Sequence, residues 1–244
     1  MATQSHALPV LVTRPEPQAS RFASQLRDAF GEKVHTVVSP LLAPVFMQTA
    51  LPEGSFGAII LTSETGVTAA QRLMESGANL PSAAFCVGDR TAECAKSAGF
   101  KTLSAHADAA ALAELVSRYR EFGPFLHLRG RETRGDLLRL LHAQGIAARD
   151  IVVYGQDPVP LSAEAVQMLE QSGHVALPVF SPRSAVLLLA ALESVSCKAD
   201  LTIVAMSAAV AEVFAGSGKW RILTADKPEA AAMLTVLAEI VFKA

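Results

Sequence analysis

The 244-residue sequence is poor in the features that mark several common classes of protein. Its three cysteines, Cys86, Cys94 and Cys197, are odd in number and lack CxxC spacing, so we expect buried free thiols in a reducing compartment. The longest purely apolar run, 185–192, is far shorter than the roughly 18 residues that a membrane-spanning helix needs. The start of the chain resembles neither a signal peptide nor a transit peptide. We therefore expect a cytoplasmic protein with no membrane partner.

Charge and motif content exclude further classes. Charged residues make up 18% of the chain and the net charge is −2, without the dense Lys/Arg patches that bind phosphate backbones, so no nucleic-acid partner is expected. The six histidines form no HxH or HExxH motif, and GxGxxG and Walker A loops are missing. The sequence therefore indicates neither a metal nor a nucleotide, and we expect no cofactor.

Short apolar runs rich in Val, Ile and Leu alternate with amphipathic stretches of helical period, which is typical of βαβ units and a parallel sheet. The predicted strands are 8–12, 34–38, 58–61, 84–87, 125–128, 151–153, 177–180, 201–205 and 221–223. The fold class that follows is α/β, with two similar doubly wound, flavodoxin-like parallel-sheet domains, because the length suits two cores better than one.

Two segments interrupt this alternation and are interpreted as linkers. Residues 39–47 and 155–162 each contain two prolines, which disfavour both helices and central strands. We expect a discontinuous domain 1 at 1–39 plus 161–244 and an inserted domain 2 at 46–153. Residues 40–45 and 154–160 then form the hinge linkers.

An internal repeat supports this division. LTSETGV at 61–67 resembles FSPRSAV at 180–186, and Asp108 follows Ser63 by the same 45 positions that separate Asp226 from Ser181. VLVTRP at 10–15 corresponds to FLHLRG at 125–130, so this unit leads one half of the chain and closes the other. The carboxyl ends of the strands in both domains are expected to face one cleft, because open α/β sheets bind ligands at that edge.

Hydroxyl residues and arginines follow several predicted strands. Helix N-termini offer unpaired N–H groups to anions, although simple N-capping explains Ser and Thr at such places equally well. A guanidinium suits a carboxylate. The candidates are Thr62, Ser63, Thr91 and Ser181 among the hydroxyls, and Arg14, Arg129, Arg134 and Arg183 among the arginines. Tyr154 ends a strand beside the second linker, where its phenol could serve a ligand or simply be a hydrated strand-end group.

Taken in order, these motifs resemble the uroporphyrinogen-III synthase family over nearly the whole chain. The motifs are TRP at 13–15, TS at 62–63, VGxxTA at 87–92, LRGxxxRxxL at 128–137, VVY at 152–154 and FSPxSAV at 180–186. The resemblance implies two α/β domains joined by a two-stranded linker, with the first domain discontinuous. It also implies a lyase of tetrapyrrole biosynthesis, which converts hydroxymethylbilane into uroporphyrinogen III with loss of water and inversion of the last pyrrole, without a cofactor. A monomer is expected.

The same resemblance implies roles for single residues. A tyrosine matching Tyr154 is the family's proposed acid. The substrate carboxylates would be bound by residues at the strand ends, which are Arg14, Thr62, Ser63, Gly88, Thr91, Arg129, Gly130, Arg134, Ser181, Arg183 and Ser207. Departures from the family pattern are Val210 in place of a hydroxyl residue, Glu64 in place of a neutral one, and the lack of an arginine after Tyr154.

Two alternatives stay open at this point. Two α/β lobes around a hinge also describe proteins that bind a small anionic ligand without catalysis. An enzyme acting on nucleotides or sugars could share the doubly wound fold, although the missing phosphate loop counts against it.

Overall fold

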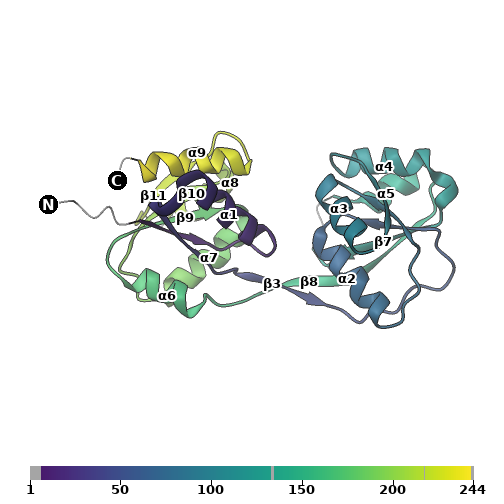
Figure 1. The fold of residues 1–244 in the computed structure, drawn as a ribbon, viewed down its shortest axis with the longest axis horizontal. Helices are drawn as coiled ribbons and strands as arrows, with labels where there is room; N and C mark the ends of the chain where they lie inside the picture. Colours follow the sequence, from purple (N-terminus) through teal and green to yellow (C-terminus); the bar gives the residue numbers. More distant parts are fainter. Residues whose placement is uncertain (1–6, 133–134, 217, 243–244) are drawn as a thin grey trace. The chain divides into compact units, whose positions relative to one another are not determined.

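The structure is a computed structural model that describes residues 7–132, 135–216 and 218–242. The chain divides into two compact units (Figure 1). Unit 1 comprises the described residues of Met1–Ala43 and Pro158–Ala244, and unit 2 comprises those of Pro44–Asp157. Each unit has its own sheet and its own cores, so each is described by itself.

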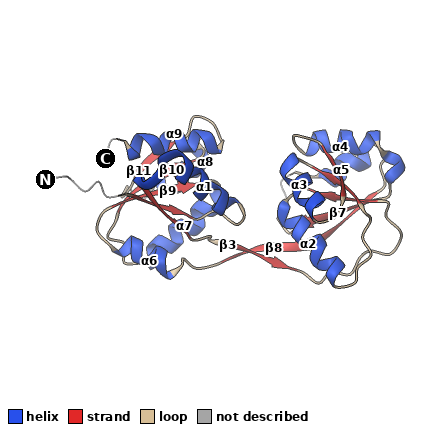
Figure 2. Ribbon diagram, viewed as in Figure 1, coloured by secondary structure: helices blue, strands red, loops and turns tan. Residues whose placement is uncertain are grey.

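Unit 1 is a parallel sheet with helices on both faces (Figure 2). In the described residues its strand order is β11-β10-β9-β1-β2. The strands are β1 (Leu8–Val12), β2 (Val34–Val38), β9 (His174–Val179), β10 (Asp200–Ala205) and β11 (Arg221–Thr224). The helices α6 (Ala163–Glu170), α7 (Pro182–Ser194) and α8 (Ala208–Ala215) share one core, and α1 (Gln18–Phe30) and α9 (Ala230–Val241) share the other. A short 3-10 turn, Gly31–Lys33, follows α1.

Unit 2 repeats this arrangement. Its sheet has the order β3-β8-β7-β4-β5-β6 within the described part of the chain. The strands are β3 (Leu42–Phe46), β4 (Ala58–Leu61), β5 (Ala83–Cys86), β6 (Lys101–Ser104), β7 (Phe125–Gly130) and β8 (Ala148–Pro158). The helices α2 (Glu64–Glu75) and α3 (Asp89–Ser97) pack on one face, and α4 (Ala109–Arg118) and α5 (Leu137–Ala143) on the other. A 3-10 turn, Arg120–Phe122, follows α4.

The sequence repeat corresponds to the same topology in both units. Strands β4, β5 and β6 occupy the places that β9, β10 and β11 occupy in unit 1, and β7 and β8 correspond to β1 and β2. Ser63 and Ser181 cap α2 and α7 in the same way, since their hydroxyls accept hydrogen bonds from the N–H of Gly66 (3.0 Å) and of Ser184 (3.1 Å). The prediction of two doubly wound parallel sheets is confirmed.

Two strands were not predicted from the sequence. β6 has the sequence Lys-Thr-Leu-Ser, without an apolar run. It lies at the edge of the sheet, next to β5 alone, and none of its residues is fully buried. β3 contains Pro44, which an edge strand tolerates because its outer N–H groups need no partner. The two proline segments, which were interpreted as linkers, contain β-structure: β3 lies in the first, and β8 continues through the second to Pro158 and pairs with β3.

None of the helices in the described part of the chain has both the length and the apolar character needed to cross a membrane.

Candidate active site

A cavity of about 650 Å³ lies in unit 2 at the carboxyl ends of β4 and β7 and beside β8. The starts of α4 and α5 close its other side. Among its lining residues are Thr62, Ser63, His127, Arg129, Gly130, Glu132, Asp136, Asp150 and Tyr154. Five of the residues singled out from the sequence thus meet in one cavity: Thr62, Ser63, Arg129, Gly130 and Tyr154.

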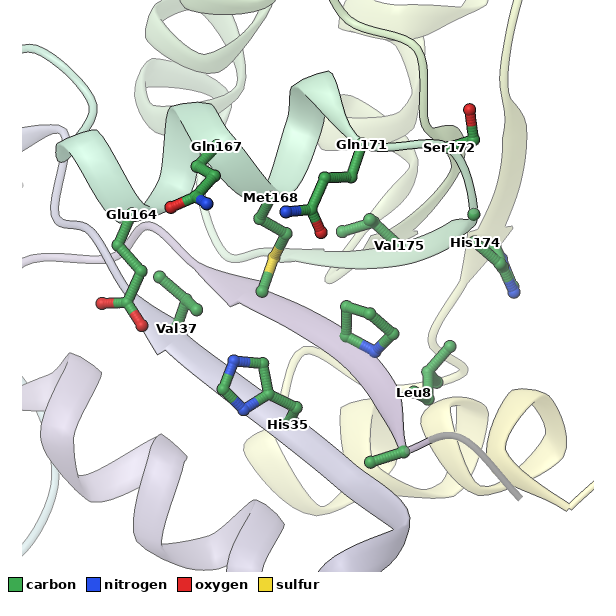
Figure 3. Close-up of a pocket in the computed structure, with 13 residues that line it drawn as sticks. Leu8, His35, Val37, Glu164, Gln167, Met168, Gln171, Ser172, His174 and Val175 are labelled. Carbon is green, nitrogen blue, oxygen red and sulfur yellow. The ribbon is translucent and has the colours of Figure 1, made fainter. Parts of the chain in front are cut away.

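A cavity of similar size in unit 1 contains none of the predicted site residues. It has a volume of about 690 Å³ and lies between α6 and the amino ends of β1, β2 and β9. Gln167 on α6 and Gln171 directly after it reach toward the cavity, with Met168 between them and His35 opposite on β2 (Figure 3). Because open α/β sheets bind ligands at their carboxyl edge, the chemistry points to the unit 2 cavity.

An irregularity of β8 determines the face of the sheet on which Tyr154 lies. Arg129 pairs with Val152, but the next residue, Gly130, pairs with Tyr154, so Val153 is an extra residue on β8. Such a β-bulge turns the following side chain to the other face of the strand. Tyr154 therefore packs on the face of the sheet that α2 and α3 cover, instead of sharing a face with Val152.

The phenol of Tyr154 is held by Ser63. The two hydroxyl oxygens are 2.8 Å apart, and the Ser63 oxygen also accepts the N–H of Gly66 at 3.0 Å. Either hydroxyl can be the donor in this pair, and when Ser63 donates to the tyrosine oxygen the phenol proton is free for another acceptor. Burial raises the pKa of Tyr154, the Ser63 hydrogen bond lowers it, and the negative charge of Glu132 raises it. The phenol is therefore neutral at physiological pH.

Gly130 makes room for the tyrosine ring. A Cβ atom at this position would lie 2.8 Å from Cζ and 2.9 Å from both Cε2 and Oη of Tyr154. Real Cβ atoms do not approach other atoms so closely, so a side chain here would displace the ring. Gly130 thus belongs to the site through its lack of a side chain.

His127 is a buried polar residue in an otherwise apolar strand. Its Nε2 lies 3.3 Å from Oγ1 of Thr62, and its side chain is 5% exposed. Burial is the main reason that the pKa of His127 falls to about 4; Asp150 raises it and Arg129 lowers it further. The imidazole is therefore uncharged at neutral pH and serves as a hydrogen-bonding group of fixed orientation.

Arg129 is engaged within the protein. Its Nε donates a hydrogen bond to Oδ2 of Asp150, and its Nη1 donates to the carbonyl oxygen of Gly130 at 3.1 Å. The two side chains of this ion pair are 27% and 29% exposed. The next arginine, Arg131, pairs with Asp157 at 3.3 Å on the surface. The carboxylates nearest these arginines come from β8.

Among the described residues that line the cavity, acidic side chains outnumber basic ones. Glu132, Asp136 and Asp150 are acidic, Arg129 is basic, and His127 is neutral. Asp136 caps α5 by accepting the N–H of Arg139 at 3.0 Å. Such a lining suits a ligand group that carries or develops positive charge.

The remaining site residues predicted in unit 2 are Gly88, Thr91 and Arg134. Gly88 precedes the first turn of α3, where a Cβ atom would meet no other atom within 4 Å, and it follows Val87, which lines the cavity. Thr91 is buried on α3. Arg134 lies outside the described residues.

The predicted residues of unit 1 follow its strands at the equivalent edge. The Arg14 guanidinium lies 4.0 Å from the ring centroid of Phe180, and Ser181 caps α7 while its hydroxyl donates to that of Ser184 at 2.9 Å. Arg183 is exposed in the first turn of α7, and Ser207 precedes α8. These residues belong to a different unit from Tyr154.

Two residues that depart from the family pattern, Val210 and Glu64, have different places in the structure. Val210 is 1% exposed and packs in the core shared by α6, α7 and α8, so it stabilises unit 1 instead of facing a ligand. Glu64 is the first residue of α2, where a carboxylate interacts favourably with the helix dipole.

Several residues of the cavity were not proposed as site residues from the sequence, among them His127, Asp150 and Glu132. A histidine inside the buried run FLHLRG was the available signal, since a polar group in such a strand needs a partner. Asp150 and Glu132 gave no comparable signal because both stand in polar surroundings. Within the described residues no group of three His, Cys, Asp or Glu side chains could hold a metal ion.

A family model and solved structures are similar to this chain. The family model described as uroporphyrinogen-III synthase HemD matches residues 20–235. The structure is similar to that of uroporphyrinogen-III synthetase from Helicobacter pylori, with a TM-score of 0.62, 20% identity, and coverage of 96% of this chain and 99% of that one. A mutant uroporphyrinogen III synthase from Thermus thermophilus gives a TM-score of 0.48 and 14% identity, with coverage of 98% and 100%. Comparison with curated protein sequences finds no match.

Proposed function

This chain belongs to the uroporphyrinogen-III synthase family, and we propose that the unit 2 cavity carries out the acid-assisted step of the family's reaction. In that reaction hydroxymethylbilane loses water, closes its ring and inverts the last pyrrole to give uroporphyrinogen III. The observation that carries the proposal is the neutral Tyr154 phenol, which Ser63 holds at 2.8 Å at the edge of the cavity.

The first step needs a proton at the leaving hydroxyl of the substrate. Tyr154 donates its phenolic proton to that oxygen, the carbon–oxygen bond breaks, and water leaves. The electron pair of the pyrrole nitrogen replaces the lost bond, so the pyrrole becomes cationic and Tyr154 becomes a phenolate. The Ser63 hydroxyl, donating to the tyrosine oxygen, stabilises the negative charge that forms there.

The acidic lining of the cavity supports the same step from the other side. Glu132 stands in the cavity that receives the cationic pyrrole, and neither the neutral His127 nor the Arg129–Asp150 ion pair, whose charges balance, adds an opposing charge. A negative group held at the place where positive charge develops lowers the barrier to forming that charge.

The carboxylates of the substrate need a different set of groups. We propose that the carboxyl edge of each sheet supplies them, through hydroxyls, N–H groups at helix starts and arginines. In unit 2 these are Thr62, Ser63, Gly88, Thr91, Gly130 and Arg134. In unit 1 they are Arg14, Ser181, Arg183 and Ser207. We further propose that the protein acts as a monomer in the cytoplasm.

The reaction is tested by its product. Purified protein is incubated with freshly generated hydroxymethylbilane, and the uroporphyrin isomers are separated by chromatography after oxidation. Isomer III is expected to predominate, whereas the protein-free control yields isomer I. Isomer I alone in both samples would contradict the proposed function and favour a protein that binds its ligand without turnover.

A further inference from the structure

We infer that Arg129 and Asp150 are positioning residues, which fix the end of β7 so that Tyr154 is held in its buried orientation. This inference rests on the proposed function of Tyr154. It gives the arginine a different task from the substrate carboxylate binding that the sequence pattern suggests.

A continuous set of contacts links the ion pair to the phenol. Asp150 accepts the Nε hydrogen bond of Arg129, and Nη1 of the same guanidinium donates to the carbonyl oxygen of Gly130 at 3.1 Å. Gly130 pairs with Tyr154 in the ladder, directly after the extra residue on β8. The tyrosine ring then lies against Gly130, where no Cβ atom would fit.

The placement of the ion pair explains why it is needed. A β-bulge leaves its extra residue unpaired, so the strand ends beside it are held by fewer ladder hydrogen bonds than regular strands. Here the bulge occurs between Arg129 and Gly130, which is where the guanidinium bonds the backbone. Arg129 thus replaces part of the hydrogen bonding that the ladder loses at this point.

The same contacts leave Arg129 poorly suited to a substrate carboxylate. Its Nε and Nη1 already have acceptors, and the carboxylate of Asp150 lies against it. A second anion would have to displace Asp150 or approach a guanidinium whose charge is already balanced. The geometry therefore assigns the pair to the protein's own structure.

The pKa of the Tyr154 phenol depends on the surroundings of its ring, so it can be used to test the inference. The sequence contains two tyrosines, so Tyr119→Phe leaves Tyr154 as the sole phenol, and its ionisation is read from the near-ultraviolet absorbance of the phenolate. In this background we compare Arg129→Ala and Asp150→Ala. Asp136→Asn is the matched control, because it removes one carboxylate charge from the same cavity, leaves Arg129 untouched, and keeps a good capping residue on α5.

The two variants separate positioning from charge. If the pair positions Tyr154, removing either residue loosens the ring, exposes it to water, and lowers its raised pKa toward the ordinary value. If only charge matters, loss of the Asp150 carboxylate lowers the pKa of Tyr154 but loss of the Arg129 cation raises it. Equal downward shifts in both variants, larger than in Asp136→Asn, are expected. Shifts of opposite sign would overturn the inference.

Kinetics give a second, independent readout. Loss of positioning lowers kcat by between about tenfold and a hundredfold, with little change in KM. The double variant then resembles the single variants, because residues that act as a unit are not additive. Arg129→Lys keeps the charge and the fold but lacks the planar fork, so it is also expected to have a low kcat. A raised KM with unchanged kcat in Arg129→Lys or Arg129→Ala would show that Arg129 binds substrate.

The phenol titration and the kinetics also distinguish this inference from the proposed function. If both variants shift the titration downward but Tyr154→Phe keeps full turnover, the positioning role stands and the role of Tyr154 as the acid fails. If Tyr154→Phe is inactive but the titration is unchanged in both variants, the proposed function stands and the positioning role fails.

Discussion

The hydroxyl oxygens of Tyr154 and Ser63 lie 2.8 Å apart, although the two residues are separated by 91 positions in the sequence. Ser63 follows β4 and caps α2, and Tyr154 follows the bulge on β8. One serine therefore both begins a helix and orients the proposed acid. This double role leads to the first prediction.

Ser63→Ala is expected to lower kcat by about tenfold, since the developing phenolate loses a hydrogen bond worth about 1–2 kcal/mol. It should also destabilise the protein by about 1 kcal/mol through loss of the cap. The control is Ser162→Ala, which removes the cap of α6 in unit 1 without touching Tyr154. Steady-state kinetics and urea unfolding check both effects. Equal turnover in the two variants would contradict the role given to Ser63.

Gly130→Ala places a methyl group against the ring of Tyr154. Overpacking of this kind costs about 1–3 kcal/mol of unfolding free energy, and turnover should fall because the ring must move. In a Tyr154→Ala background the same substitution should cost little, because the clash is gone. Gly216→Ala serves as the control, since no atom lies within 4 Å of its new methyl group. A cost of Gly130→Ala that persists without the tyrosine would show that another contact is responsible.

The lowered pKa of His127 makes stability depend on pH. The imidazole takes up a proton near pH 6.5 in the unfolded chain but only near pH 4 in the folded protein. The unfolded state thus binds more protons between these values, and the free energy of unfolding falls as the pH decreases from about 6.5 to about 4. The loss from this group amounts to about 3 kcal/mol at most.

His127→Gln removes the titrating group and keeps a hydrogen-bonding partner for Thr62. Unfolding followed by circular dichroism at pH 6.5 and pH 4.5 should therefore show a smaller loss of stability for this variant than for the unaltered protein. The same loss in both proteins would place the pH dependence elsewhere.

Glu132 raises the pKa of Tyr154 and faces the cavity in which the pyrrole cation is proposed to form. Glu132→Gln is expected to lower the pKa of the phenol and to reduce kcat by a few-fold, because an exposed carboxylate is partly screened by water. Raising the ionic strength should weaken the effect of the substitution. A variant that turns over faster than the unaltered protein would contradict the role of negative charge in this cavity.

The architecture could be predicted well from the sequence because the strands of a buried parallel sheet are nearly continuous apolar runs. The internal repeat added a second, independent indication of two similar domains. β3 and β6 escaped prediction because edge strands need no apolar run and tolerate proline. Tyr154 and Ser63 could each be proposed from their positions at strand ends. The contact between them could not be predicted, because it depends on the β-bulge at Val153. The alternation of side chains in the sequence does not indicate that bulge.

Arg129 shows the limit of reasoning from residue type. An arginine after a strand suggests an anion site, yet a carboxylate 21 positions later in the chain occupies it. Pairings between side chains on neighbouring strands depend on register, which short apolar runs do not specify. His127 was detectable as a polar residue in a buried strand, but its contact with Thr62 was not.

The central claim is that the phenol of Tyr154 supplies the proton for the loss of water. The most direct measurement compares kcat for Tyr154→Phe with that for Tyr119→Phe, which removes the other tyrosine, a partly exposed residue at the end of α4. We predict that Tyr154→Phe loses at least about a hundredfold in kcat, as expected when a general acid is removed, while its circular dichroism spectrum stays the same and Tyr119→Phe keeps normal turnover. Normal turnover in Tyr154→Phe would contradict the account.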